Sequence, residues 1–263
     1  MKESRRKFLK IAGISAIGIG AGSMVNVFAS TEAAKEAEAA AATQFKKRPE
    51  ALSAVHWGMV IDTRKINADL AAKIQATCHK VHNVPALTGK QEIKWIWPSD
   101  YKHVFPMQYN PNLSESLKAR PILALCNHCE NPPCARACPT KATFQRADGL
   151  VLMDFHRCIG CRFCMAACPY GARSFNFQDP KPFVAELDHM YPHRMKGVVE
   201  KCNFCAERLA RGQMPACVEV SKGAIIVGDL EDPNSNVCKA LKANNSIRRK
   251  PSLGTEPSVY YIV

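Results

Sequence analysis

The most constraining feature of this sequence is a run of four cysteines, C-x2-C-x2-C-x3-C-P, between Cys158 and Pro169. Three thiolates on such a tight loop wrap one side of a cube-shaped iron–sulfur cluster, while the fourth cysteine, on the helix that leaves the loop, points to another cluster. A second run, from Cys126 to Pro139, repeats the pattern with two extra residues before its third cysteine. The tails C-P-T-K-A and C-P-Y-G-A also correspond, so the two runs form an internal repeat.

This spacing is typical of [4Fe–4S] ligation in bacterial ferredoxins, where the fourth cysteine of each run binds the cluster of the other run. The rule predicts one cluster held by Cys126, Cys129, Cys134 and Cys168. It predicts a second cluster held by Cys138, Cys158, Cys161 and Cys164. Structural zinc favours two separated cysteine pairs around one ion, and c-type haem needs C-x-x-C-H, which the sequence lacks. The two runs therefore indicate iron–sulfur chemistry.

A third cysteine run is incomplete. It contains three cysteines, Cys202, Cys205 and Cys217. At the place of the fourth stands Ser221, or Val220 if the following Gly-Ala pair sets the register. An isolated Cys78 lies far upstream, and cross-ligation predicts that it completes a third [4Fe–4S] cluster. The alternative is that Cys78 is a buried apolar cysteine and that the third site is empty or binds zinc. The thirteenth cysteine, Cys238, lies outside every motif and is expected to be a packing residue.

The N-terminal segment has the layout of an export signal. Residues 4–10 carry the twin-arginine pattern S-R-R-x-F-L-K, and an apolar, glycine-rich stretch follows. We expect 1–29 to be a Tat signal peptide cleaved before Ser30; the alternatives are a Sec signal or a retained membrane anchor. Residues 30–54 are rich in alanine and charge and predict a linker, so the folded part is expected to span 55–263.

The basic charge has a related explanation. The formal net charge is +13, and five basic side chains and one acidic side chain lie in 1–29, so the mature chain keeps +9. Three cysteinyl clusters, at about −2 each when oxidised, bring this to about +3. A nucleic-acid partner therefore loses its main support.

The remaining pattern predicts an α+β fold built from tandem bacterial ferredoxin-like modules with short strands and helices around cysteine-rich loops. Strands are expected at 55–62, 174–177 and 224–228, helices at 66–81 and 235–243, and a hairpin with an Asp-Gly turn at 143–154. The stretch 93–111 is loop-like and aromatic, and it either packs against the body or forms a partner surface. Two modules are predicted: a two-cluster module, 118–180, inserted into an outer module made of 55–117 and 181–263.

From residue 55 to 263 the sequence resembles the four-cluster ferredoxin-like electron-transfer subunits of membrane oxidoreductases of the polysulfide, tetrathionate and dimethylsulfoxide reductase type. In that pattern the first cysteine run lies between Ile66 and Cys78, where one cysteine survives, and the last run lacks its fourth. The two losses delete one whole cluster and leave a full ligand set for its partner. The motifs C-N-H-C-E-N-P-P-C and K-C-N-F-C and the ending L-G-T-E-P-S-V-Y-Y-I-V are most similar to the O-subunit family of the DsrMKJOP transmembrane complex associated with dissimilatory sulfite reductase.

The resemblance implies an exported iron–sulfur subunit at the periplasmic or extracytoplasmic face of the cytoplasmic membrane. It implies docking on a polytopic, quinone-interacting NrfD-type membrane subunit and a neighbouring multihaem cytochrome c, in sulfate or sulfur respiration. It also implies a route toward a cytoplasmic iron–sulfur subunit. No small-molecule substrate or nucleic-acid partner is expected.

We therefore expect an electron-transfer subunit that relays single electrons, and not an enzyme, since the sequence shows no nucleophile arrangement, Walker motif or dinucleotide loop. One alternative is an enzyme that binds substrate at an open iron, if Cys78 does not reach the third site. Another is a subunit that serves a molybdopterin catalytic subunit. His128 and His156, beside cluster cysteines, are expected to be polar neighbours and not ligands. Three arginines either offset cluster charge or are ordinary solvated residues: Arg162, Arg208 and Arg211.

Overall fold

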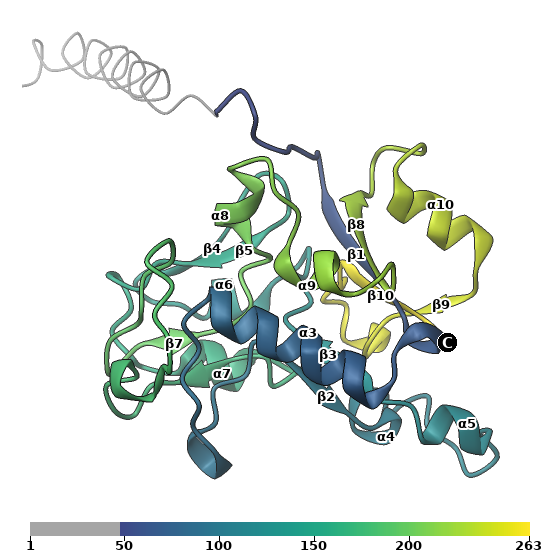
Figure 1. Cartoon of the computed structure of the whole chain (residues 1–263), viewed down its shortest axis with the longest axis horizontal. Helices are drawn as coiled ribbons and strands as arrows, with labels where there is room; N and C mark the ends of the chain where they lie inside the picture. Colours follow the sequence, from purple (N-terminus) through teal and green to yellow (C-terminus); the bar gives the residue numbers. More distant parts are fainter. Residues whose placement is uncertain (1–47) are drawn as a thin grey trace, which may run out of the picture. The chain divides into compact units, whose positions relative to one another are not determined.

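A four-stranded mixed sheet joins the two ends of the described chain (Figure 1). The computed structural model describes residues 48–263, so the predicted signal peptide and residues 30–47 of the predicted linker lie outside the described residues. The strands run in the order β8-β1-β10-β9 and comprise β1 (Trp57–Asp62), β8 (Ile225–Asp229), β9 (Ser246–Ile247) and β10 (Val259–Ile262). Strand β1 is parallel to β10 and antiparallel to β8. All six residues of β1 are buried, as expected for a central strand covered on both faces.

The longest described helix, α3 (Ala68–Val81), confirms the helical periodicity. The helix begins at Ala68 because the side chain of Asn67 accepts a hydrogen bond from the amide of Leu70 at 2.8 Å, an N-cap. The preceding residues, Thr63–Lys65, form a 3-10 turn. The buried face of α3, which includes Cys78, packs against α9 (Ala216–Val220).

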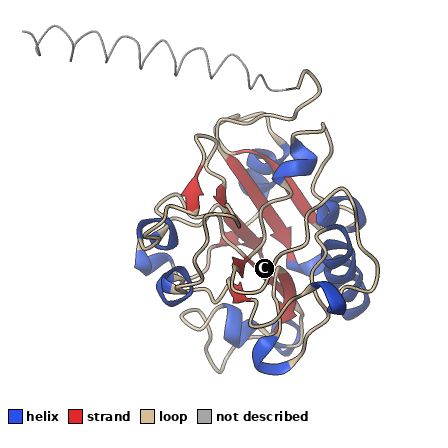
Figure 2. Ribbon diagram, turned by 90° about the vertical axis from the view of Figure 1, so that its left-hand side faces the viewer, coloured by secondary structure: helices blue, strands red, loops and turns tan. Residues whose placement is uncertain are grey.

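Many of the helices and strands are short and are joined by loops (Figure 2). The hairpin of β4 (Thr143–Gln145) and β5 (Val151–Met153) forms as predicted. Two further antiparallel pairs are β2 (Ile96–Ser99) with β3 (Ile122–Leu125), and β6 (Ser174–Phe175) with β7 (Val199–Glu200). The other helices are α4 (Tyr101–Val104), α5 (Glu115–Lys118), α6 (Pro133–Arg136), α7 (Phe163–Ala167), α8 (Ala206–Leu209) and α10 (Asn236–Ala243). Three-residue 3-10 turns occur at Gly89–Gln91, Lys181–Phe183 and Pro251–Leu253. Mixed helices and strands confirm the α+β class.

The prediction that 93–111 is a loop is wrong in part, because this stretch contains β2 and α4. Pro98 lies inside β2, where a proline argues against a strand; it is tolerated because β2 pairs on one side alone. The packing role of the stretch is confirmed for Trp95 and Phe105, which are fully buried. Tyr109 lies at the surface.

The division into two modules stays a prediction. Strand pair β2–β3 crosses the predicted boundary at 117/118, and β6–β7 crosses the one at 180/181. The compact unit of the described chain begins at Glu50, earlier than expected, and the amide of Leu52 donates to the carbonyl of Leu209 at 2.9 Å. Within residues 48–263, no helix has the length and apolar character needed to cross a bilayer.

Candidate metal centres

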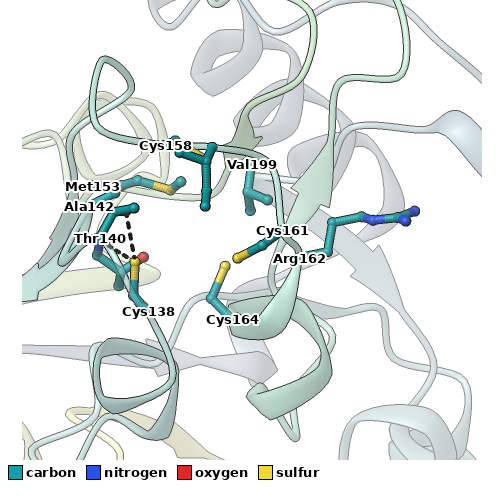
Figure 3. Close-up of a pocket in the computed structure, with 11 residues that line it drawn as sticks. Cys138, Thr140, Ala142, Met153, Cys158, Cys161, Arg162, Cys164 and Val199 are labelled. Carbon is teal, nitrogen blue, oxygen red and sulfur yellow. Dashed lines mark hydrogen bonds between the residues drawn. The ribbon is translucent and has the colours of Figure 1, made fainter. Parts of the chain in front are cut away.

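Four cysteines face one pocket (Figure 3). We call these four cysteines the second group: Cys138, Cys158, Cys161 and Cys164. The space between protein atoms at this pocket, with its solvent-open part included, amounts to about 270 Å³. Its other lining residues are largely apolar, among them Met153, Ile159 and Val199. Cys161 is exposed and Cys164 is buried, so this group reaches from the core to the surface. An all-sulfur donor set in an apolar pocket suits an iron–sulfur cluster.

The first group combines three cysteines of one run with the last cysteine of the other: Cys126, Cys129, Cys134 and Cys168. Burial raises the pKa of the Cys129 thiol to about 12, and charge on Cys126, Cys134 and Cys168 acts in the same direction. This mutual effect places the four sulfurs near one another. Because a cysteine ligand must be deprotonated, thiols with such raised pKa values depend on a bound metal to become thiolates.

The third group brings Cys78 to the incomplete run: Cys78, Cys202, Cys205 and Cys217. Burial, followed by charge on Cys205, Cys202 and Cys217, raises the pKa of the Cys78 thiol well above its ordinary value. All four cysteines are buried. Helix α3 therefore places Cys78 near the three cysteines of the incomplete run, where it provides a fourth thiol for the group.

The three groups lie in series. Charge on Cys126 of the first group affects the pKa of Cys202 in the third. Charge on Cys134 of the first group affects the pKa of Cys164 in the second. The first group therefore lies between the other two.

Left-handed backbone conformations shape the cysteine loops. Gly160 and Arg162 in the second run have φ values of 69° and 63°, and Phe204 and Cys205 in the third run have 62° and 50°. A side chain at Gly160 would collide with the carbonyl oxygen of Gly197, since an added Cβ would lie 2.3 Å from it. This position therefore requires glycine for both conformation and space.

The ends of helices α7 and α9 favour one of the two candidates for the missing fourth cysteine. Cys168 is the C-cap of α7, and its amide donates to the carbonyl three residues before. Ser221 is the C-cap of α9 and makes the same bond to Val218 at 3.1 Å. Ser221, and not Val220, is the counterpart of Cys168.

The region of the lost first run is a regular helix. Counting C-x2-C-x2-C-x3-C back from Cys78 gives Ala68, Ala71 and Ile74, all within α3. Ala71 and Ile74 are fully buried. The regular, amphipathic helix α3 therefore stands in place of a cysteine loop, and polar residues at its start line an open pocket together with Ser221.

Sequence reasoning missed a polar cluster beside the third group. The ring of His82 stacks on Trp95 with centroids 4.5 Å apart, and its Nε2 lies 3.0 Å from Oε1 of Glu207. Ligand atoms of His82, Glu207 and Cys205 all lie within 4.8 Å of one another, a possible alternative metal set. However, the other ring nitrogen of His82 is 2.8 Å from the carbonyl oxygen of Cys78, so the histidine is engaged by hydrogen bonds on both sides. Nothing in the local spacing signals this cluster, because its residues come from distant segments.

The residues expected as neighbours of the clusters differ in burial and orientation. His128 is fully buried, accepts a hydrogen bond from the amide of Val151 at 3.1 Å and lies beside Cys126, whereas His156 is exposed. Arg162 points away from the pocket of the second group (Figure 3) and stacks over Phe175.

Other predicted polar or packing residues have ordinary partners. Arg208 forms an ion pair with Glu219 at 2.7 Å, although its charge also acts on the thiol of Cys217. The Nε of Arg211 is buried, without a hydrogen-bond partner among the described residues. Cys238 is half-buried on α10, and its thiol donates to the carbonyl of Leu230 at 3.3 Å. Its role as a packing residue outside the three groups agrees with this contact.

Several known proteins are similar to this chain in sequence. A family model described as a 4Fe-4S dicluster domain matches residues 121–182, which contain the first two groups. The chain is 38% identical to the Hdr-like menaquinol oxidoreductase iron-sulfur subunit 1 of Archaeoglobus fulgidus, over 98% of this chain and 97% of that protein. It belongs to this family of 4Fe-4S electron-transfer subunits.

Two further relatives define the breadth of the family. The iron-sulfur cluster-binding subunit of the menaquinone reductase of Nitratidesulfovibrio vulgaris is 32% identical over 79% of this chain and 89% of that protein. A tetrathionate reductase subunit of Salmonella typhimurium is 43% identical over 52% of this chain and 50% of that protein. The family members are iron–sulfur subunits of oxidoreductase complexes and not their catalytic subunits. This confirms the expected electron-transfer class and the binding of 4Fe-4S clusters.

Proposed function

We propose that this subunit relays single electrons through three [4Fe–4S] clusters, one in each cysteine group, in the order third, first, second. The observation that carries the proposal is the position of Cys78, which gives the third group a fourth thiol. When bound, a [4Fe–4S] cluster accepts and releases one electron without a change of ligands. The chain holds each cluster by four thiolates and covers the first and third groups with apolar residues that exclude water.

The exposure of the cysteines supports an electron path with one end in the interior, at the third group, and the other end at the surface, at the second group. This holds for either direction of electron flow. All four cysteines of the third group are buried, whereas Cys161 of the second group is exposed. Since electron tunnelling weakens steeply with distance, the second group is the natural point of exchange with a redox partner. The position of Cys78 beside the other three cysteines argues against the alternative of an enzyme with an open iron, which requires this ligand to be missing.

We further propose that the chain is exported by the Tat route and acts at the extracytoplasmic face of the membrane. The twin-arginine motif in residues 1–29 supports this, and the relatives named as menaquinol and menaquinone oxidoreductase subunits support a quinone-interacting membrane partner. An NrfD-type membrane subunit, a multihaem cytochrome c and a role beside dissimilatory sulfite reductase in sulfate or sulfur respiration complete the proposal. A second candidate function is electron transfer to or from a molybdopterin catalytic subunit. The similarity to tetrathionate and polysulfide reductase subunits, which extends over 52% of this chain, favours this candidate.

The test of the cluster assignment is the content of iron and acid-labile sulfide per chain. We expect about 12 irons in the wild type and about 8 in Cys78→Ser, since each cluster contains four. Cys238→Ser is the matched control, because this half-buried cysteine lies outside the three groups, and it is expected to keep about 12 irons. A wild-type content of about 8 that Cys78→Ser leaves unchanged would contradict the proposal.

The test of the partners is purification of the tagged chain from its native membrane after mild solubilisation. Recovery of a polytopic membrane subunit together with a multihaem cytochrome supports the main proposal. Recovery of a molybdenum-containing subunit in equal amount favours the second candidate. Cell fractionation, with the Arg5→Lys/Arg6→Lys variant as control, tests export: the variant is expected to stay in the cytoplasm.

A further inference from the structure

Two basic side chains are buried next to the cysteine groups. Lys201 is 2% exposed and Arg173 is 5% exposed. Among residues 48–263, neither forms an ion pair with a carboxylate, whereas the buried Arg194 does. A buried charge without a counter-charge is costly, and proteins either pair it or lose it. The surroundings of these two residues must therefore supply negative charge.

Lys201 lies at the junction of the third and first groups. Its ammonium donates to the carbonyl of Cys202, a third-group residue, at 2.8 Å and to the carbonyl of Val151. The amide of Val151 in turn donates to Nδ1 of His128 at 3.1 Å, and His128 stands between two first-group cysteines in sequence.

This position brings one ammonium close to both groups. Cys202 of the third group directly follows Lys201 in the sequence, and a single residue, Val151, links the ammonium to His128 in the loop of the first group.

Arg173 lies at the junction of the first and second groups. Its NH1 donates to Oγ1 of Thr143 at 3.2 Å and lies 3.7 Å from Sδ of Met153; both residues line the pocket of the second group. Its charge also acts on Cys164 of the second group and on Cys134 of the first. Its NH2 is buried with no hydrogen-bond partner in the described chain, as expected of a donor directed at a group that the protein binds.

We propose that Lys201 and Arg173 are the counter-cations of the relay, one at each junction, and that each raises the reduction potentials of the two clusters beside it. This inference rests on the proposed function. Reduction adds one negative charge to a cluster, and a fixed cation in a medium of low dielectric constant stabilises that charge. The first group is flanked by both cations, and each outer group by one. The two residues therefore act as positioning charges, which set where an electron resides.

The proposal predicts a distinct pattern of reduction potentials. Lys201→Met is expected to lower the potentials of the third and first clusters and leave the second unchanged. Arg173→Met is expected to lower those of the first and second and leave the third unchanged. We expect at least a tenfold loss of electron affinity at each affected cluster, which is about 59 mV for one electron. The measurement is a redox titration of the purified holoprotein followed by electron paramagnetic resonance.

Matched variants separate charge from packing. Lys201→Arg and Arg173→Lys keep the charge and are expected to keep the potentials within a threefold change in electron affinity. Lys196→Met removes an exposed lysine from the same part of the chain and is expected to change none of the three. Unchanged potentials in Lys201→Met and Arg173→Met, at full iron content, overturn the inference and leave the proposed function standing. A wild type with fewer than three clusters overturns the proposed function instead.

Cluster loss is also an informative outcome. If the methionine variants lose iron, Lys201→Gln and Arg173→Gln make the same comparison. Loss of iron in all neutral variants, with retention in Lys201→Arg and Arg173→Lys, supports the counter-charge role. Loss of iron in the charge-retaining variants as well shows that the sites require the exact side chains for folding. This result overturns the proposed counter-charge role.

Discussion

Replacement of Glu200 by glutamine is expected to destabilise the protein strongly. The Glu200 carboxylate is completely buried, forms an ion pair with Arg194 at 2.7 Å, and accepts hydrogen bonds from Nε1 of Trp95 at 2.7 Å and from Nδ2 of Asn176 at 2.6 Å. Arg194 is also completely buried, and it ties the segment after Tyr191 to the carbonyls of His82 and Asn83. Glu200→Gln keeps the shape of the side chain but leaves the Arg194 guanidinium without a counter-charge. The NH2 group of the new glutamine also faces N–H donors, so these donors lose their acceptor.

The magnitude follows from the burial of both partners. Removing one member of a buried ion pair costs about 3–5 kcal/mol, because the other charge stays in the interior. For a unit of this size, about 2–4 °C per kcal/mol, this lowers the transition temperature by roughly 6–20 °C. The assay is differential scanning calorimetry of the holoprotein at one fixed scan rate, since cluster loss makes unfolding irreversible.

Two variants complete this experiment. Glu186→Gln removes a carboxylate whose ion pair with Lys80, at 2.9 Å, is exposed, and its transition is expected to coincide with that of the wild type. Arg194→Met combined with Glu200→Gln removes both charges and is expected to regain part of the loss. A transition for Glu200→Gln within about 3 °C of the wild type would refute the reasoning, since it would correspond to about 1 kcal/mol.

Three further outcomes can be checked. Ile74→Ala opens a cavity on the buried face of α3 and is expected to cost about 2–5 kcal/mol, measured as a lowered transition temperature, with the exposed Lys73→Ala as control. Ser221→Cys is expected to leave iron content unchanged, because α3 stands in place of the other three ligands; a gain of about four irons would contradict this explanation. A chelator with a mild oxidant is expected to release about four irons per chain quickly from the second group, where Cys161 is exposed, and about eight slowly; uniform release would contradict the order of burial.

The prediction of the cysteine groups rests on sequence spacing, because cluster loops are local. The spacing of each run determines which thiolates face one cluster, and the internal repeat indicates which fourth cysteine crosses over. The position of Cys78 in the third group needed one more step, the inference that two partial runs complement each other. The helix that carries it was predictable from periodicity, although its start was set by the Asn67 cap.

The charges around the groups could not be predicted, because they depend on contacts between distant segments. Glu200 meets a guanidinium from one loop and an indole from a stretch about a hundred residues earlier. Arg173 and Lys201 stand beside cysteine motifs in sequence, yet a basic residue next to a ligand is common in a chain with 36 lysines and arginines. Burial distinguishes Arg173 from Arg162, and burial is a property of the folded chain.

The parallel pairing of β1 with β10 has a consequence for the order of folding. Met59 of β1 aligns with Val259 of β10 on one side and with Val227 of β8 on the other, so the sheet is built from segments far apart in the sequence. Pairing over such long loops costs more chain entropy than forming a local hairpin or cysteine loop. The sheet is therefore expected to close late in folding. Helix α3, which follows β1 and carries Cys78, is then expected to gain its final support after the loops of the first and second groups have formed.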